Sequence, residues 1–314
     1  MKRILLLYYS QTGDASEIAR TFIGPLADMS GVEIATQSIE PIQPFPFPWG
    51  SLRRLLSVFP ECQIGQGCTV QPLAIDHTRP FDLVVLAYQV WHLAPSLPVQ
   101  GFLKSPDAAI LDGKRVVTLC VCRSMWHAGS ETMKRLLHEA GAVHLDNVVV
   151  SHQGPVFATF VSVPRLLLFG KRDRAWGIFP PAGVSQADLD RVRRLGSVVA
   201  ERLKQAPNDW PRESLLRGVG AVQVKRRYVI PELIGLAICR FWARLVLWAG
   251  RFGSVPRRLA EYGYMAMLLS MVLCGMPVTL LLLLLASPFT HRWVECRAAV
   301  LAAPSGEGND QLRG

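Results

Sequence analysis

The feature that most constrains the fold lies near the start of the chain, where a strand pattern turns into a helix pattern. Residues 4–7 form an apolar run typical of a buried strand, and residues 15–29 place apolar side chains at helical spacing. The turn between them reads Tyr8-Tyr9-Ser10-Gln11-Thr12-Gly13-Asp14-Ala15-Ser16-Glu17. A helix N-terminus offers unpaired N–H groups and the positive end of its dipole, so this turn predicts an anion site.

The composition of the turn narrows the class of anion. Ser10 and Thr12 add hydroxyl donors, and Gly13 lets the backbone come close to a ligand. The turn holds no lysine or arginine and the chain has no GxxxxGK[ST] motif, which argues against a triphosphate. A single phosphate monoester fits better, and flavin mononucleotide (FMN) carries such a group.

Strand and helix patterns alternate through the first part of the chain. Strands are expected at 4–9, 32–38, 82–87, 115–120 and 147–151. Helices are expected at 15–29, 97–103, 129–141 and 185–205, whereas the Pro/Gly-rich stretch 41–67 and the stretch 154–183 are expected to be irregular. The alternation predicts an α/β fold with a doubly wound, parallel, five-stranded sheet. In such a sheet the loops after the first, third and fourth strands converge at the switch point, where a ligand binds.

The charge is unevenly distributed along the 314 residues. The formal net charge is +10; residues 1–170 hold 13 Lys/Arg and 13 Asp/Glu, and residues 171–314 hold 21 and 11. The second part is also strongly apolar from residue 228 onward, which favours anionic lipid as a partner over nucleic acid. The seven cysteines are scattered and the start shows no signal-peptide pattern, so reduced thiols are expected.

The C-terminal third predicts a membrane-associated helical extension. We expect a basic linker at 206–227 and an amphipathic, interfacial helix at 228–260, in which Arg240 and Arg244 share one helical face. Residues 262–289 then run for 28 positions without a charged side chain, so a transmembrane or membrane-anchoring helix is expected at 261–290. A re-entrant hairpin and a core helix of a soluble domain are the alternatives. A flexible tail at 291–314 completes the extension, and the upstream arginines predict attachment to the cytoplasmic side of the inner membrane.

The turn at residues 8–16 resembles the phosphate loop of flavodoxins, (S/T)-x-T-G-x-(S/T). It departs from that pattern at Ala15, where the family has a hydroxyl, and Ser16 follows one place later. The loop from Val85 to Pro98 is similar to the flavodoxin loop whose aromatic residue stacks on the isoalloxazine ring. The resemblance implies an FMN-binding domain at 1–205. It implies these cofactor-binding residues: Ser10, Gln11, Thr12, Gly13, Asp14, Ala15, Ser16, Val90, Trp91, His92, Arg123, Ser124 and Trp126. A core position is the alternative for Trp91.

The loop after the fourth expected strand, Cys122-Arg123-Ser124-Met125-Trp126-His127, occupies the place where flavodoxin-like proteins wrap the flavin's N5 edge and pyrimidine. Arg123 there can hydrogen-bond the O2 side of the flavin, or pair with Glu131 or Asp146. His127 is the first candidate for acid/base catalysis because histidine titrates near neutral pH, and a structural role is its alternative. His92 and Tyr88 are the other catalytic candidates. We expect no metal site, because the pair Cys120 and Cys122 lacks further partners at ligand spacing.

Three further segments extend the resemblance over roughly residues 1–205. Residues 122–126, 153–165 and 179–184 are similar to a flavodoxin-like group known as dialkylresorcinol condensing enzymes. A condensing enzyme needs an activated cysteine on a longer thiolase-type fold, which this chain lacks. A flavin site suits the other step of the pathway that the resemblance implies, namely the dehydrogenation that aromatises a dialkylcyclohexanedione made by a partner ketosynthase. A lipophilic substrate would also explain the apolar, basic C-terminal part.

Three other functions remain open from the sequence. A flavodoxin-like quinone reductase would also act on a lipid-soluble substrate. An electron carrier is disfavoured, because electron-carrier flavodoxins present an acidic face and this chain is basic. The departure at Ala15 keeps open a flavin-free scaffold for a ketosynthase.

Overall fold

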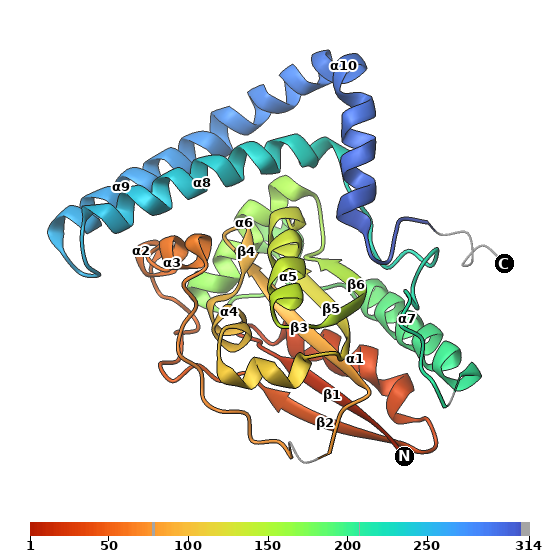
Figure 1. The fold of residues 1–314 in the computed structure, drawn as a ribbon. Helices are drawn as coiled ribbons and strands as arrows, with labels where there is room; N and C mark the ends of the chain where they lie inside the picture. Colours follow the sequence, from red (N-terminus) through yellow and green to blue (C-terminus); the bar gives the residue numbers. More distant parts are fainter. Residues whose placement is uncertain (77–78, 207, 309–314) are drawn as a thin grey trace.

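The computed structural model describes residues 1–76, 79–206 and 208–308, and a parallel sheet lies at its centre (Figure 1). Five strands pair in parallel in the order β2-β1-β3-β5-β6. They are β1 (Lys2–Tyr8), β2 (Val32–Ser38), β3 (Leu83–Trp91), β5 (Arg115–Cys122) and β6 (Val143–Ser151). Among the five parallel strands this order is 2-1-3-4-5, the flavodoxin-like doubly wound topology. The predicted fold class is therefore confirmed. The two-residue β4 (Ala94–Pro95), which pairs antiparallel with the end of β3, was not predicted.

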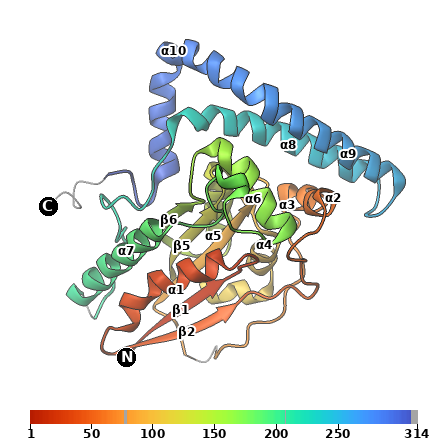
Figure 2. The ribbon, with the colours of Figure 1, turned by 180° about the vertical axis from the view of Figure 1, so that it is seen from behind.

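Helices cover both faces of the sheet, which is why its strands are continuous apolar runs. Alternate residues of β1 enter different cores: Ile4 and Leu6 pack with one cluster of buried side chains, Leu5 and Leu7 with the other. Helices α1 (Asp14–Ala27) and α7 (Gln186–Gln205) cover the first face, in front of the sheet in Figure 2. Helices α4 (Leu97–Leu103) and α5 (His127–Glu139) cover the second, in front of the sheet in Figure 1.

The two stretches expected to be irregular contain helices. Residues 41–67 include α2 (Leu52–Leu56) and α3 (Phe59–Ile64), and residues 154–183 include α6 (Val156–Phe169) and the 3₁₀ turn η2 (Ala175–Gly177). Pro155 directly precedes α6 and Gly170 ends it in a left-handed conformation. Proline before a helix and glycine after it are ordinary boundary residues. The many prolines and glycines of these two stretches therefore mark helix ends and not irregular structure. A further 3₁₀ helix, η1 (Pro106–Leu111), precedes β5.

The C-terminal third forms a bent set of helices that run above the sheet domain and return to it (Figures 1 and 2). After the 3₁₀ turn η3 (Arg226–Tyr228) come α8 (Val229–Ala249), α9 (Val255–Ser270), the π-helical turn η4 (Met271–Gly275) and α10 (Met276–Ala302). The helix predicted over 228–260 is therefore interrupted, because Gly250 ends α8 with a φ of 147°. Such a dihedral is accessible to glycine and breaks the helix.

The stretch 261–290, expected to form one transmembrane or membrane-anchoring helix, is divided among α9, η4 and α10. In the described part of the chain, no single helix has both the length and the apolar content to cross a bilayer. Two consecutive helical segments, Val255–Gly275 and Pro277–Ala286, meet those criteria together and are bent by 47° at their junction. Pro277 at the start of the second segment accounts for the break, since proline removes a backbone donor.

Both ends of the C-terminal extension pack against the sheet domain. Tyr264 of α9 stacks on Phe59 of α3 with ring centroids 3.6 Å apart, and the buried Arg257 pairs with Glu61 at 2.8 Å. At the other end, Leu301 of α10 joins the second core. Residues 291–302 thus belong to α10 and not to the flexible tail that was expected. Residues 309–314 of that tail lie outside the described residues.

The stretch 206–227, expected to be a linker, contributes to the core of the sheet domain. Trp210 and Leu216 are buried in the same cluster as Ile4, and the backbone N–H groups of Leu215 and Leu216 donate to the carboxylate of Asp146 on β6. Burial raises the pKa of Asp146 above its usual value. Residues 1–205 are therefore not a complete structural unit without the segments that follow them.

Candidate functional site

The turn between β1 and α1 has the geometry of an anion site. Gly13 caps α1 with a φ of 93°, and no side chain caps the first turn of the helix, so its N–H groups remain available. The Ser10 hydroxyl is buried and has no hydrogen-bond partner. Buried polar atoms are nearly always paired, and an unpaired donor beside an uncapped helix N-terminus fits a phosphate group.

Two of the predicted phosphate ligands are engaged elsewhere. Ala15 is fully buried in the first core, so its position offers no hydroxyl to the turn. Ser16 does not replace it, because its hydroxyl donates to the Gly13 carbonyl at 2.8 Å. The available donors of the turn are therefore the Ser10 hydroxyl and the first N–H groups of α1.

Asp14 is the center of a polar cluster that the sequence analysis did not anticipate. Its carboxylate is 1% exposed, pairs with the Arg172 guanidinium at 2.7 Å and accepts a hydrogen bond from the Thr12 hydroxyl at 2.6 Å. Arg172 also donates to the carbonyl of Thr12. The buried carboxylate is thus neutralised by an arginine that comes from the segment between α6 and α7.

His152 approaches the same carboxylate from the end of β6. Its Nδ1 accepts a hydrogen bond from the Gly183 N–H, so Nε2, 3.8 Å from Asp14, carries the proton. Burial lowers the pKa of His152, which keeps the ring neutral at pH 7. Because the carboxyl ends of parallel strands share one edge of the sheet, the position of His152 directly after a predicted strand was a usable signal. Nothing local to Arg172 indicated its role.

An aromatic cluster lies next to the phosphate turn and contains Trp91, at the end of β3. Its ring makes edge contacts with Tyr9, Phe45 and Trp49 at centroid distances of 5.7, 5.3 and 6.1 Å. Trp49 comes from the stretch that was expected to be irregular and was not predicted as a site residue. Trp91 is half-buried and supplies a flat apolar surface of the kind that an isoalloxazine ring requires, whereas Trp49 is 3% exposed and packs against it.

Hydrogen bonds join the phosphate turn to the aromatic cluster. Gln89 of β3 accepts from the Gln11 N–H at 3.2 Å and donates to the Thr12 hydroxyl at 3.1 Å. The indole N–H of Trp49 donates to the Gln11 side chain at 3.3 Å. The structure therefore brings Ser10, Gln11, Thr12, Gly13, Asp14 and Trp91 together at the switch point. A cleft of about 280 Å³ opens beside them and is lined by Tyr9, Ser10, Ser16 and Glu40.

In the loop after β5, the predicted flavin ligand Arg123 contacts other residues of the protein, whereas Ser124 has no partner. The Arg123 guanidinium lies 3.8 Å from the Phe160 ring center and donates to the Thr159 hydroxyl at 3.2 Å, and burial lowers its pKa to about 10. The alternative pairing of Arg123 is wrong, since Glu131 pairs with Lys134 and Arg297 and Asp146 accepts from backbone N–H groups. The Ser124 hydroxyl is buried without a partner and remains available to a ligand.

Trp126 belongs to the second core rather than to an open ring site. It is 2% exposed, and its ring lies edge-on to His127 at 4.6 Å. Val90 is half-buried and packs against α5 at Gly129.

Cys120 and Cys122 are buried, and burial raises the pKa of Cys120 well above its ordinary value. Within residues 1–76, 79–206 and 208–308, no group of three or more His, Cys, Asp or Glu side chains is placed to hold a metal ion.

The three predicted catalytic residues lie in different surroundings. Tyr88 is fully buried in the second core, and burial raises the pKa of its phenol well above 10. His92 sits in the β3–β4 turn with a φ of 47°, edge-on to Phe59, and burial lowers its pKa to about 4. Tyr88 is sealed in the core and stays protonated at neutral pH. His92 is half-buried beside Phe59 of α3, and its lowered pKa keeps it neutral and makes it a weak base at pH 7.

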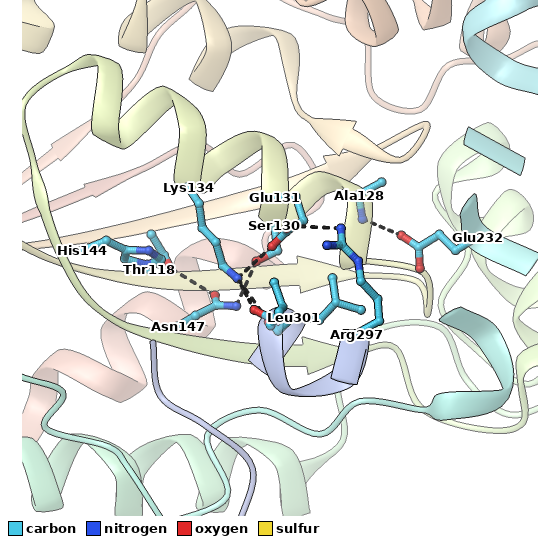
Figure 3. A network of polar contacts seen from close by, with 11 residues as sticks. Thr118, Ala128, Ser130, Glu131, Lys134, His144, Asn147, Glu232, Arg297 and Leu301 are labelled. Atoms are coloured by element: carbon cyan, nitrogen blue, oxygen red, sulfur yellow. Dashed lines mark hydrogen bonds and ion pairs between the residues drawn. The ribbon is translucent and has the colours of Figure 1, made fainter. Parts of the chain in front are cut away.

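His127, the first residue of α5, is the exception because it lines a cavity. Its Nδ1 lies 2.9 Å from Oε2 of Glu232, a buried residue of α8. Oε1 of that carboxylate accepts from the Ala128 N–H at 2.8 Å (Figure 3). The cavity has a volume of about 360 Å³ and lies between α5, α8 and the end of α10. Sequence reasoning selected His127 but gave no signal for Glu232, which is 105 residues further along the chain.

Comparison with known proteins adds structural likenesses only. No family model matches the chain, and no curated protein matches it. A Lactobacillus acidophilus flavoprotein in complex with FMN is 15% identical, with 48% of this chain and 93% of that chain covered and a TM-score of 0.37. A flavodoxin, WrbA-like protein from Agrobacterium tumefaciens is 12% identical, over 65% and 99% of the two chains, with a TM-score of 0.34. An azoreductase from Bacillus anthracis is 8% identical, over 63% and 99%, with a TM-score of 0.34. At these values the fold assignment rests on the strand order of the chain itself.

Proposed function

We propose that this chain is a membrane-associated, FMN-dependent oxidoreductase that dehydrogenates a lipophilic ring. The observation that carries the proposal is the switch-point site, where the unpaired Ser10 hydroxyl and the uncapped N-terminus of α1 lie beside Trp49 and Trp91. Donors for a phosphate monoester and flat apolar surfaces for a ring are the two requirements for binding FMN.

The residues of the site fit FMN, and the phosphate end of the site also contains the Asp14–Arg172 ion pair. The Ser10 hydroxyl and the first N–H groups of α1 would hold the phosphate, while Gln11 and Thr12 shape the turn through their hydrogen bonds to Gln89. The half-buried Trp91 would contact the ring, with Trp49 packed against it. Asp14 brings a carboxylate close to the phosphate, and Arg172, paired with it at 2.7 Å, offsets that charge. FMN, when bound, accepts a hydride from a substrate.

His127 is the residue that would take the substrate's proton. Dehydrogenation of a dialkylcyclohexanedione to a resorcinol removes a hydride and a proton, and the proton needs a base within reach. Glu232 Oε2 lies 2.9 Å from Nδ1 of His127, and neither ring nitrogen has a hydrogen-bond partner among the described residues, so the ring can accept a proton from a ligand. The resemblance to dialkylresorcinol condensing enzymes suggests this substrate, supplied by a partner ketosynthase.

The C-terminal helices support attachment to a membrane. Large apolar side chains of α8, α9 and α10 are exposed, and Phe289 is 91% exposed. Exposed arginines of α8, among them Arg240 and Arg244, stand near these apolar residues in the sequence. An exposed apolar surface with neighbouring cations suits an anionic bilayer, and the positive-inside rule favours the cytoplasmic side of the inner membrane in this proposal.

A spectroscopic experiment tests the proposal. The full chain is purified from detergent-solubilised membranes, its visible spectrum is recorded, and a dialkylcyclohexane-1,3-dione is added without oxygen. We expect a flavin band that bleaches on addition of the dione. In His127→Gln the flavin content should stay constant while bleaching slows by about 100-fold, the lower range for loss of a general base.

The other outcomes separate the alternatives. A colourless protein that does not take up added FMN would exclude every redox function and leave the scaffold. A flavin band that the dione does not bleach, but that NAD(P)H reduces and a quinone rapidly restores, would identify a quinone reductase instead.

A further inference from the structure

The cavity lined by His127 is a built site that the redox proposal does not fully explain. It lies where α5, α8 and the end of α10 meet, and its volume is about 360 Å³. In Figure 3, Glu232 of α8 and Arg297 of α10 approach the same end of α5 from two sides. The C-terminal extension therefore forms walls of this cavity together with the sheet domain.

The floor of the cavity holds buried polar atoms that lack partners. His127 is 5% exposed and Glu232 is 1% exposed. Their closest approach, 2.9 Å between Nδ1 and Oε2, has an ion-pair distance without the angle of a hydrogen bond, so both ring nitrogens and Oε2 remain unsatisfied. Buried polar groups are rarely left so, and a ligand hydroxyl that donates here would complete the arrangement.

The mouth of the cavity carries a cation without a partner. Arg297 pairs with Glu131 at 3.3 Å, and Arg135 pairs with Glu139 at 2.6 Å. Arg240 also lines the cavity, and no ion pair or hydrogen bond occupies its guanidinium among the described residues. An unpaired guanidinium at the rim favours a ligand with a negative oxygen.

The remaining residues that line the cavity are apolar, and one of them is exposed at the protein surface. Val229, Leu233, Leu236 and Leu301 line the cavity, and Leu233 is 37% exposed. Leu233 thus connects the cavity to the exposed apolar surface of α8 that the membrane proposal uses. A ligand bound here meets polar atoms at one end and aliphatic side chains along its length.

We infer that this cavity binds a single-chain amphiphile whose head is an acidic pair of oxygens, as in a carboxylic acid or the enol of a β-dicarbonyl. One oxygen meets the His127–Glu232 pair, the other faces Arg240, and the chain lies along Leu233 and Leu236. The inference goes beyond the proposed redox reaction, because binding in this cavity does not require a flavin.

Photolabelling of the full chain tests this site. The chain is placed in nanodiscs of neutral phosphatidylcholine and irradiated with decanoic acid that carries a diazirine on its chain. The uncharged methyl amide of the same acid is the matched probe. We expect the acid, but not the amide, to label peptides of α8 that contain Leu233 and Leu236.

Two exposed arginines of α8 provide a matched pair of variants. Arg240→Gln should reduce labelling by about fivefold, the upper range for a partly exposed ion pair. Arg244, one turn further along α8, does not line the cavity, and Arg244→Gln should label like the original chain. Leu236→Trp, which fills the cavity, should abolish labelling while circular dichroism confirms that the chain is folded.

Equal labelling by the acid and the amide would overturn the inference, as would equal loss in Arg240→Gln and Arg244→Gln. Labelling confined to residues 278–289 would also overturn it, because the acid would then only partition onto the exposed apolar surface. The flavin spectrum of the same samples is recorded separately, so failure of this site and failure of the FMN proposal are distinguishable.

Discussion

The sheet domain buries most of its large apolar side chains, whereas the C-terminal helices leave many of theirs exposed. In α1, Ile18, Phe22 and Leu26 are fully buried against the sheet. In α10, Leu285 is 69% exposed and Phe289 is 91% exposed. Both segments are rich in apolar residues, so hydrophobicity alone did not distinguish them. The difference is that the apolar side chains of the first helix pack within the chain, whereas those of the second are exposed.

Two phenylalanine substitutions test this comparison directly, and they carry the largest expected effect. Phe22→Ala should lower the free energy of unfolding by about 3–5 kcal/mol, because it leaves a cavity in a packed core. Phe289→Ala should change it by less than about 0.5 kcal/mol, as expected for an exposed position. Chemical denaturation of the full chain in a neutral detergent measures both. A comparable loss in the two variants would show that Phe289 packs against a partner within the protein.

Charged substitutions on α10 test the same contrast through membrane binding. Leu281→Asp with Leu285→Asp should reduce flotation with anionic vesicles by at least about tenfold, since each carboxylate opposes insertion by roughly 1–3 kcal/mol near the interface. Matched controls are Ile42→Asp and Ile178→Asp, at exposed apolar positions of the sheet domain. If the control variants lose flotation to the same extent, the membrane-binding surface is not the one proposed.

The phosphate site can be tested through the two partners of one ion pair, whose substitution should have opposite effects. Asp14→Asn removes a carboxylate next to the expected phosphate and frees Arg172, so FMN should bind about tenfold more tightly. Arg172→Gln leaves the carboxylate without its partner and should weaken FMN binding by a similar factor. Titration with flavin, followed by fluorescence quenching, measures both affinities.

Riboflavin is the matched ligand for this experiment because it has the same ring and no phosphate. Neither Asp14→Asn nor Arg172→Gln should change riboflavin affinity by more than about twofold, since the charge interaction is absent. Equal effects on FMN and riboflavin would mean that the substitutions act on the shape of the site and not on the phosphate.

Those parts of the molecule that are determined by residues close together in the sequence were predicted correctly. The apolar runs located all five parallel strands, and the Ser10–Gly13 turn was correctly placed at the start of α1. Trp49, Gln89 and Arg172 reach the site only through the tertiary fold, and no local pattern marks them. His152 was marked only by its position directly after a predicted strand. Tyr88 and Trp126 were misjudged for a related reason. Both lie on loops or strand ends near the site, but their side chains point into the core.

Two half-buried histidines of the sheet domain, one of them next to the C-terminal helices, provide the smallest predicted effect. Burial lowers the pKa of both His144 and His92 from 6.5 to about 4. His144 lies in β6 and contacts Thr118 at 2.9 Å, whereas His92 lies beside Phe59, on which Tyr264 of α9 stacks. As pH falls from 6.5 toward 4 the unfolded chain binds protons that the folded chain does not, so stability is lost across that range.

Each histidine should lower the free energy of unfolding by about 0.7 kcal/mol between pH 7 and pH 6. His144→Gln and His92→Gln should each reduce this loss by that amount in pH-dependent denaturation. If His92→Gln leaves the pH dependence unchanged while His144→Gln reduces it, the contact between the C-terminal helices and α3 opens in solution and exposes His92 to water.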